Sequence, residues 1–125
     1  MRRTFREGGG FEEAAAYSRA VRIGQYVAVS GTAPRLGGDV YEQTREAIAR
    51  ALAGAGELGA SKEDVLRTRV LLLQGCDWKA AIRAHAEAFA GVEPANTTYF
   101  VSGFIPDDVL VEVELDAVIE DAPPR

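Results

Sequence analysis

The alternation of residues 109–119 constrains the fold of this chain more than any other stretch. Every second position is apolar, and the positions between them include three acids, Glu112, Glu114 and Asp116. Successive side chains of a pleated strand point to opposite faces, so the pattern predicts a strand over residues 110–119 with one face in a core. The acidic face is typical of a half-exposed strand in contact with solvent. In the alternative interpretation, Glu112 lines the floor of a pocket.

Shorter patterns predict four more strands and two helices. Runs of β-branched and aromatic residues indicate strands at residues 17–23, 26–32, 65–73 and 97–101. Gly24 and Gln25 separate the first two runs, which favours a hairpin. Apolar residues at spacings of three and four predict a helix over residues 41–58. Asp77 is expected to cap a second helix, whose apolar stripe consists of Trp78, Ala81, Ile82, His85 and Phe89.

Together these elements predict one α/β (α+β) domain over residues 1–125, with residues 121–125 as a frayed tail. We expect a two-layer sandwich in which two helices cover one face of a mixed sheet of five or six strands, and of these two numbers we take six. Residues 26–29 are apolar at both odd and even positions, so both faces of a strand there are apolar and are expected to be covered. Because monomers rarely expose a large apolar sheet face, we expect a second copy of the chain to cover the bare face.

Composition narrows the possible function classes. The net charge of −5 disfavours contact with nucleic-acid phosphates, so no nucleic-acid partner is expected. The sequence has no apolar leader and no apolar run long enough to span a bilayer, which predicts a cytoplasmic protein with no membrane partner. Residues 54–59 match the glycine spacing of a dinucleotide-binding loop. They end a predicted helix instead of beginning one, so no cofactor is expected.

The chain has one histidine and one cysteine, which limits metal and nucleophilic chemistry. Neither a zinc site nor a Ser-His or Cys-His pair is expected, and Cys76 cannot form an internal disulfide. His85 is interpreted as a packed residue bonded to a backbone carbonyl or across an interface, with a role as ligand or base as the alternative. Cys76 is interpreted as a bystander, although its position at a helix start could lower its pKa. Acid and base chemistry therefore falls to carboxylates, hydroxyls and ordered water.

Five short motifs occur in the order and spacing of one known family. They comprise residues 16–21, 29–34, 43–44, 94–96 and 110–114. On these motifs the chain resembles, from Tyr17 to Ile119, the Rid family of YjgF-type reactive intermediate deaminases, also known as L-PSP endoribonucleases or translation inhibitors. The resemblance implies a homotrimer of chorismate-mutase-like protomers with a central barrel and clefts between neighbouring subunits. It also implies hydrolysis of small imines and enamines to 2-oxo acids and ammonia.

The resemblance also implies a set of site residues. A glutamate in the family's last strand holds the attacking water, which makes Glu112 the expected catalytic residue. The family's carboxylate-binding arginine directly follows Pro-Ala, whereas this chain has Asn96 at that position and Thr98 two residues later. An amide offers neutral and weaker hydrogen bonds than a guanidinium. Losing a charged hydrogen bond lowers affinity about ten- to a hundred-fold, so efficient turnover of 2-imino acids is not expected.

The resemblance, with Asn96 in place of the arginine, therefore implies an imine or enamine hydrolase with an altered substrate preference. Its small-molecule ligand is expected to contact Tyr17, Ser30, Gly31, Asn96 and Thr98 around Glu112. Arg19 has the strand parity of Tyr17 and is a possible further contact, although ion pairing with Glu112, Glu114 and Asp116 in solvent or at an interface is the simpler interpretation. One alternative is a trimeric ligand-binding or regulatory protein without turnover. The other, an endoribonuclease, is disfavoured by the acidic charge.

Overall fold

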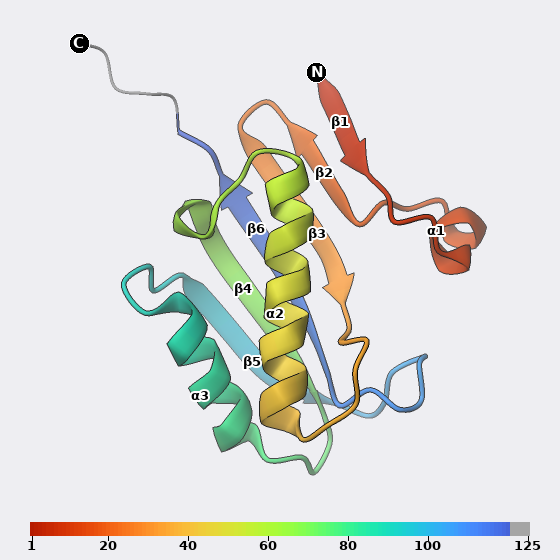
Figure 1. Ribbon diagram of the computed structural model, residues 1–125, viewed down its shortest axis with the longest axis vertical. Coiled ribbons are helices and arrows are strands. Elements are labelled where there is room, and N and C mark those ends of the chain that lie inside the picture. The colour runs from red at the N-terminus through yellow and green to blue at the C-terminus, as the bar shows by residue number, and fades with distance from the viewer. Residues whose placement is uncertain (121–125) are drawn as a thin grey trace.

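The computed structural model describes residues 1–120, and the predicted tail at residues 121–125 lies outside them. In the described part, six strands and three α-helices follow one another (Figure 1). The strands are β1 (Arg2–Phe5), β2 (Ala20–Ile23), β3 (Tyr26–Thr32), β4 (Val65–Leu73), β5 (Ala95–Val101) and β6 (Val111–Val118). The helices are α1 (Gly10–Ala15), α2 (Val40–Glu57) and α3 (Trp78–Phe89), and a short 3-10 turn, η1, spans Lys62–Asp64.

The strands form one mixed sheet in the order β1-β2-β3-β6-β4-β5. β4 and β5 are parallel and joined through α3, and the other neighbouring strands are antiparallel. Helices α2 and α3 lie side by side across one face of the sheet (Figure 1). The predicted mixed six-stranded sheet with two helices on one face is confirmed.

β6 is central both to the sheet and to the core. It pairs with β3 on one side and β4 on the other, and it packs against α2. Its acids alternate with fully buried apolar residues, which are Val111, Val113, Leu115 and Ala117. Because partners in register point to the same side of a sheet, the alternation of β6 determines which side chains of β3 and β4 are covered by the helices. The strand predicted from this alternation is confirmed.

Two elements near the N-terminus are not predicted by the sequence. β1 is a short strand at the edge of the sheet, and it pairs with β2 through backbone hydrogen bonds. α1 ends at Ala16, whose φ of 57° turns the chain just before Tyr17. The strand predicted at residues 17–23 begins only at Ala20, where pairing with Phe5 of β1 and Val29 of β3 begins.

The buried face of α3 differs from the predicted stripe. Trp78 and Ile82 are 47% and 44% exposed, so the prediction is wrong at these two positions. The residues of α3 that are buried are Ala80, Ala81, Ala84 and Phe89. Alanine side chains allow the backbones of α2 and α3 to approach closely, which leaves the larger side chains on the outer side of the helix.

Asp39 begins α2 with a capping box. Its carboxylate accepts the backbone N–H of Glu42, whose side chain accepts the N–H of Asp39. The predicted glycine-rich end is partly wrong, because Gly54 lies inside α2 and the helix continues to Glu57. Of the helices in residues 1–120, none is long and apolar enough to cross a membrane.

Candidate functional site

A bulge in β3 brings Ser30 and Gly31 beside the acidic face of β6. The register between the two strands gives β3 one extra residue between Val29 and Thr32. Bulges redirect the side chains of a strand and are frequent next to active sites. A Cβ atom at residue 31 would lie only 2.8 Å from Glu112 Oε1. Glycine at this position therefore makes room for the Glu112 carboxylate.

Glu112 lines two cavities of about 560 and 540 Å³, which we name the Glu112 cleft. Both cavities are lined by Tyr17, Arg19, Gly31 and Glu112. The first extends to α1 and to the loop of residues 103–106, and the second extends to Ser30. The structure thus brings together the predicted residues Tyr17, Ser30, Gly31 and Glu112 and the possible contact Arg19 within one chain.

The carboxyl group of Glu112 is only half accessible to water. Burial raises the pKa of Glu112 above its ordinary value of 4.5, while the positive charge of Arg19 lowers it and the negative charge of Glu114 raises it again. Burial disfavours the charged form of a carboxyl group, and a carboxylate with a raised pKa is a stronger base. Such a group in a cleft is a candidate for proton transfer.

Arg19 is fixed in the wall of the cleft. Its guanidinium donates to the Gly31 carbonyl at 2.9 Å and to Thr32 Oγ1 at 3.4 Å, and its Nε lies 3.8 Å from a Glu12 carboxylate oxygen. The guanidinium also lies over the Tyr17 ring, 5.5 Å from its centroid. Within this chain its ion-pair partner is Glu12. Ion pairing with the acids of β6 across an interface stays a prediction. Arg19 holds the bulge and the Tyr17 ring in place.

Asn96 and Thr98 lie on the face of the sheet opposite to Glu112. Both pair in register with β4 residues that are buried beneath the helices. Asn96 Nδ2 donates to Thr68 Oγ1 at 3.0 Å, and Asn96 Oδ1 accepts from Thr98 Oγ1 at 2.9 Å. Within this chain, the two residues line a separate cavity of about 80 Å³ together with His85.

His85 is a packed residue, as predicted, but its hydrogen-bond partner differs from the prediction. Its ring lies against Phe89, with centroids 4.8 Å apart, and its Nε2 is 2.7 Å from Thr68 Oγ1. The partner is thus a side-chain hydroxyl and not a backbone carbonyl. That hydroxyl also accepts from Asn96 Nδ2, so the His85 ring, the Thr68 hydroxyl and the Asn96 amide are linked by hydrogen bonds. Burial lowers the pKa of His85.

The lowered pKa of His85 predicts a loss of stability in mild acid. Above the ordinary pKa of 6.5 the ring is neutral in both the folded and the unfolded chain, so stability is fully present. As the pH falls below this value, the unfolded chain binds the proton first, and the free energy of unfolding decreases until the lower folded pKa is reached. Urea unfolding between neutral pH and about pH 5 should show a smaller decrease in His85→Gln than in the wild type. Equal decreases would contradict the lowered pKa of His85.

Cys76 and Asp77 lie at the start of α3. The pKa of the Cys76 thiol is raised by burial and by the negative charge of Asp77, so the expectation of a lowered pKa is wrong. Asp77 caps the helix as predicted, accepting the backbone N–H groups of Lys79 and Ala80. Across residues 1–120, no three His, Cys, Asp or Glu side chains are grouped so that they could hold a metal ion.

This fold and the arrangement of its motifs agree with one known family. The family model described as endoribonuclease L-PSP matches residues 10–119 of the chain. The chain belongs to the endoribonuclease L-PSP family. The match includes the bulge of β3 and the whole of β6, which together form the Glu112 side of the cleft. The family resemblance seen in the sequence motifs is confirmed.

Relatives of this L-PSP family protein share most of its length. An uncharacterized protein of Streptomyces coelicolor is 41% identical over 121 residues, which cover 92% of this chain and 90% of that protein. The crystal structure of a Mycobacterium tuberculosis member of the YjgF/YER057c/UK114 family has a TM-score of 0.91 at 39% identity, over 95% of this chain and all of that one. Reactive Intermediate Deaminase A, a chloroplastic protein of Arabidopsis thaliana, is 28% identical over 110 residues, 82% of this chain and 58% of the relative.

Three charged residues of the Glu112 cleft in this L-PSP family protein are not predicted from the sequence. Glu7, Glu12 and Arg50 all line the 560 Å³ cavity, and Glu12 is almost completely buried. Isolated charges in a loop or helix have no periodicity that would place them in a site. For Arg50 alone, the sequence spacing is informative. Arg50 lies three residues after Ala47 and four residues before Gly54, both of which are buried, so it is placed beside the buried face of α2.

Proposed function

We propose that this protein hydrolyses the C=N bond of a small imine or enamine in the Glu112 cleft, with a substrate preference altered by Asn96. The observation that carries this proposal is the half-buried Glu112 carboxyl group, whose pKa is raised, beside Tyr17 and Gly31 in an open cleft. The name of the Arabidopsis relative supports the same chemistry. The net charge of −5 does not favour an RNA substrate.

In the proposed reaction, Glu112 holds a water molecule against the carbon of the C=N bond. Glu112 takes one proton from the water as the oxygen bonds to this carbon, and it returns the proton to the nitrogen. A second proton then moves from the new hydroxyl group to the nitrogen, the C–N bond breaks, and ammonia leaves a carbonyl compound. Ser30 donates its hydroxyl proton to the Ser18 carbonyl at 2.6 Å, so it offers the substrate only an acceptor.

Ammonia release from 2-iminobutanoate and from a neutral imine of similar size tests the proposal. We expect turnover of at least one imine, with kcat/KM for 2-iminobutanoate about ten- to a hundred-fold below that of a family member with an arginine at the position of Asn96. Binding of imines without ammonia release would favour the alternative, a non-catalytic ligand-binding or regulatory protein. RNA cleavage that is lost in Glu112→Ala would favour an endoribonuclease.

Replacement of Gly31 by alanine is expected to displace the Glu112 carboxylate, because the new Cβ would lie 2.8 Å from Oε1. Since small misplacements of a reacting group are costly, kcat/KM for imine hydrolysis should fall about ten- to a hundred-fold. The displaced atoms end a flexible side chain, so the melting temperature should change little. Gly103→Ala is the matched control, since Gly103 lines the same cavity with no atom within 4 Å of its added Cβ. Equal effects of the two substitutions would contradict this role of Gly31.

We also propose that three copies of the chain close their bare sheet faces around a central barrel, with the small-molecule ligand in clefts between subunits. Tyr26 and Tyr99 support this arrangement, because they are 45% and 44% exposed on strands of the sheet. Asn96 and Thr98 are on β5, at the sheet edge, from which they could approach the cleft of a neighbouring copy. Light scattering should give three times the mass of the chain, whereas the mass of one chain would contradict the trimer. A cytoplasmic location stays a prediction.

A further inference from the structure

The helix α1 is joined to the rest of the protein through a charged side chain. Of its six residues only Glu12 is buried, and this side chain is 6% exposed. A surface helix usually buries apolar residues, because burial of a carboxylate is unfavourable unless its charge is neutralised. Arg19 supplies that charge, with its Nε 3.8 Å from Glu12 Oε2, and the backbone N–H of Glu7 donates to Glu12 Oε1 at 3.1 Å. A buried ion pair thus connects α1 to the wall of the Glu112 cleft.

Arg19 is close to a second carboxyl group, that of Glu112, but is not paired with it. Its positive charge acts on Glu112, and both residues line the two cavities of the cleft. Each nitrogen of its guanidinium has another partner. Nε faces Glu12, Nη1 donates to Thr32 Oγ1 and Nη2 donates to the Gly31 carbonyl. These contacts direct the guanidinium away from Glu112.

Six other titratable side chains line the cavities that contain Glu112, in the part of the chain that the structure describes. They are Glu7, Glu12, Tyr17, Arg19, Arg50 and Glu114. The neighbouring strands add no titratable group beside Glu112, because its partner in register on β4 is Leu71 and the β3 bulge contains Ser30 and Gly31. Glu114 lies 3.5 Å from Arg69. The acids that remain as partners for Arg19 are therefore on the N-terminal side of the cleft.

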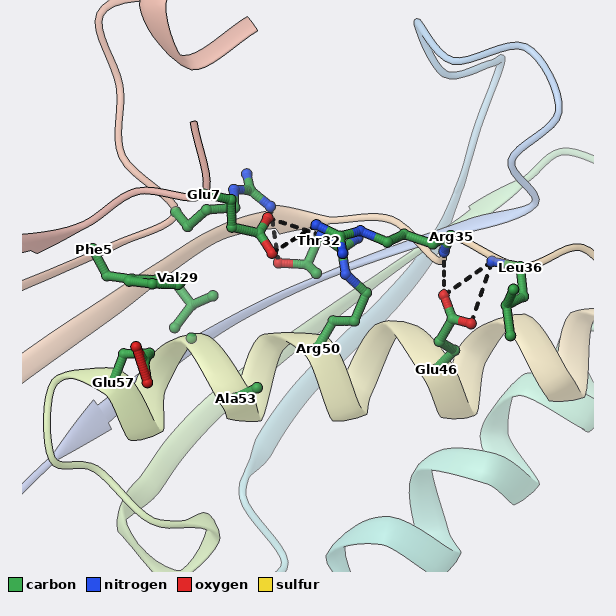
Figure 2. A pocket seen from close by; sticks show the side chains of 12 residues that line it. Phe5, Glu7, Val29, Thr32, Arg35, Leu36, Glu46, Arg50, Ala53 and Glu57 are labelled. Atoms are coloured by element: carbon green, nitrogen blue, oxygen red, sulfur yellow. Dashed lines mark hydrogen bonds and ion pairs between the residues drawn. The ribbon is translucent and has the colours of Figure 1, made fainter. Parts of the chain in front are cut away.

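Glu7 is one of these acids, and it is bound by two other arginines. Arg50 Nη2 lies 2.9 Å from Glu7 Oε1, and Arg35 Nη2 lies 3.0 Å from Glu7 Oε2. Figure 2 shows Arg50 rising from α2 toward this carboxylate, in the neighbouring cavity of about 500 Å³. Since the charge of Glu7 is already neutralised, the acid that neutralises Arg19 is Glu12.

We infer that Glu12 is a positioning residue for the proposed hydrolysis, because it holds the Arg19 guanidinium beside α1 and so keeps it from forming an ion pair with Glu112. The inference rests on the proposed function of the cleft and adds to it a residue that controls the base. An ion pair with an arginine favours the charged form of a carboxyl group and makes it a weaker base. Glu12 therefore preserves the basicity that Glu112 gains from burial.

The pKa of Glu112 tests this inference without any need for turnover. It can be measured by NMR on protein labelled with carbon-13 at the glutamate carboxyl groups, in which the Glu112 signal is the one missing from Glu112→Gln. We expect a lower pKa in Glu12→Gln, since Arg19 is then free to pair with Glu112. Arg19→Gln should raise the pKa, because it removes the positive charge. In the Arg19→Gln background, Glu12→Gln should have little further effect, as expected for a residue that acts through Arg19.

Glu13→Gln is the matched control for Glu12→Gln. It removes the same charge from the next residue of α1, but Glu13 is exposed and does not line the cleft. Loss of a buried ion-pair partner lowers stability whatever its role, so the melting temperature does not test the inference. Glu12→Asp keeps the charge, guards against a variant that fails to fold and should keep the pKa of Glu112 closer to that of the wild type. Equal shifts in Glu12→Gln and Glu13→Gln, or an undiminished shift in the Arg19→Gln background, would overturn the inference.

Hydrolysis assays separate this inference from the proposed function. In Glu12→Gln, the acid limb of the rate should move to lower pH, and kcat/KM at neutral pH should fall about three- to ten-fold, a part of what a general base contributes. A lowered Glu112 pKa in Glu12→Gln, without hydrolysis of any imine by the wild type, would refute only the proposed function. Glu112-dependent hydrolysis with the same Glu112 pKa in Glu12→Gln and the wild type would refute only this inference.

Discussion

Glu112→Gln is expected to lower kcat/KM for imine hydrolysis about 100- to 10,000-fold, the range that a general base contributes. Glutamine has the same shape, but its amide cannot take a proton from water. The wild-type rate should also fall as the pH drops through the pKa of Glu112, which lies above 4.5, and this acid limb should be absent in the variant. Ammonia release measured across a range of pH gives both results.

Glu114→Gln provides the control for this experiment. Glu114 points to the same face of β6, lines the second cavity of the cleft and lies 3.5 Å from Arg69. Its loss should leave the rate close to that of the wild type. Glu112→Gln should also keep its melting temperature at neutral pH, because burial disfavours the charged form that the substitution removes. Equal losses of rate in the two variants would contradict the role of Glu112 as the base.

Phe89→Ala is expected to lower the free energy of unfolding by about 3–5 kcal/mol. Phe89 is 2% exposed, is the largest of the fully buried side chains and packs on the His85 ring at the end of α3. Domains of this kind have only about 5–15 kcal/mol of stability in total, so the variant should be close to unfolding. Urea denaturation followed by circular dichroism measures the change.

Trp78→Ala tests the same helix at an exposed position. Trp78 has the larger side chain but is 47% exposed, so its replacement should change the free energy of unfolding by only about 0.5 kcal/mol. The sequence pattern places Trp78 and Phe89 on one core stripe and predicts similar losses. A loss at Trp78 as large as that at Phe89 would show that the outer side of α3 is covered in solution.

The elements with strong periodicity are the ones that sequence predicts well. The β3 and β4 strands have the predicted bounds, and β6 differs by one residue at each end. The buried side of α3 is harder to predict because apolar residues occur on more than one side of this helix. Its packing against α2 decides which of these sides is buried. β1 is held mainly by backbone pairing with β2, which leaves no apolar pattern in the sequence.

The candidate site is predicted where it follows a strand and is missed where it depends on distant contacts. The positions of Gly31 and Glu112 follow from motifs on β3 and β6. The face of the sheet on which Asn96 lies could not be predicted from the sequence. β5 is an edge strand with polar residues at both odd and even positions, so no alternation assigns its faces. The pair of Glu7 and Arg50 joins residues 43 positions apart, and no local pattern encodes such a contact.

The central position of β6 affects how the protein is made. β6 follows every other strand in the chain, yet it lies between β3 and β4. During synthesis on a ribosome, the β1-β2-β3 and β4-β5 halves therefore emerge with unpaired inner edges, and they cannot join until β6 has left the exit tunnel. Exposed inner edges are prone to pair with other chains, so this interval is when a nascent chain most needs a chaperone.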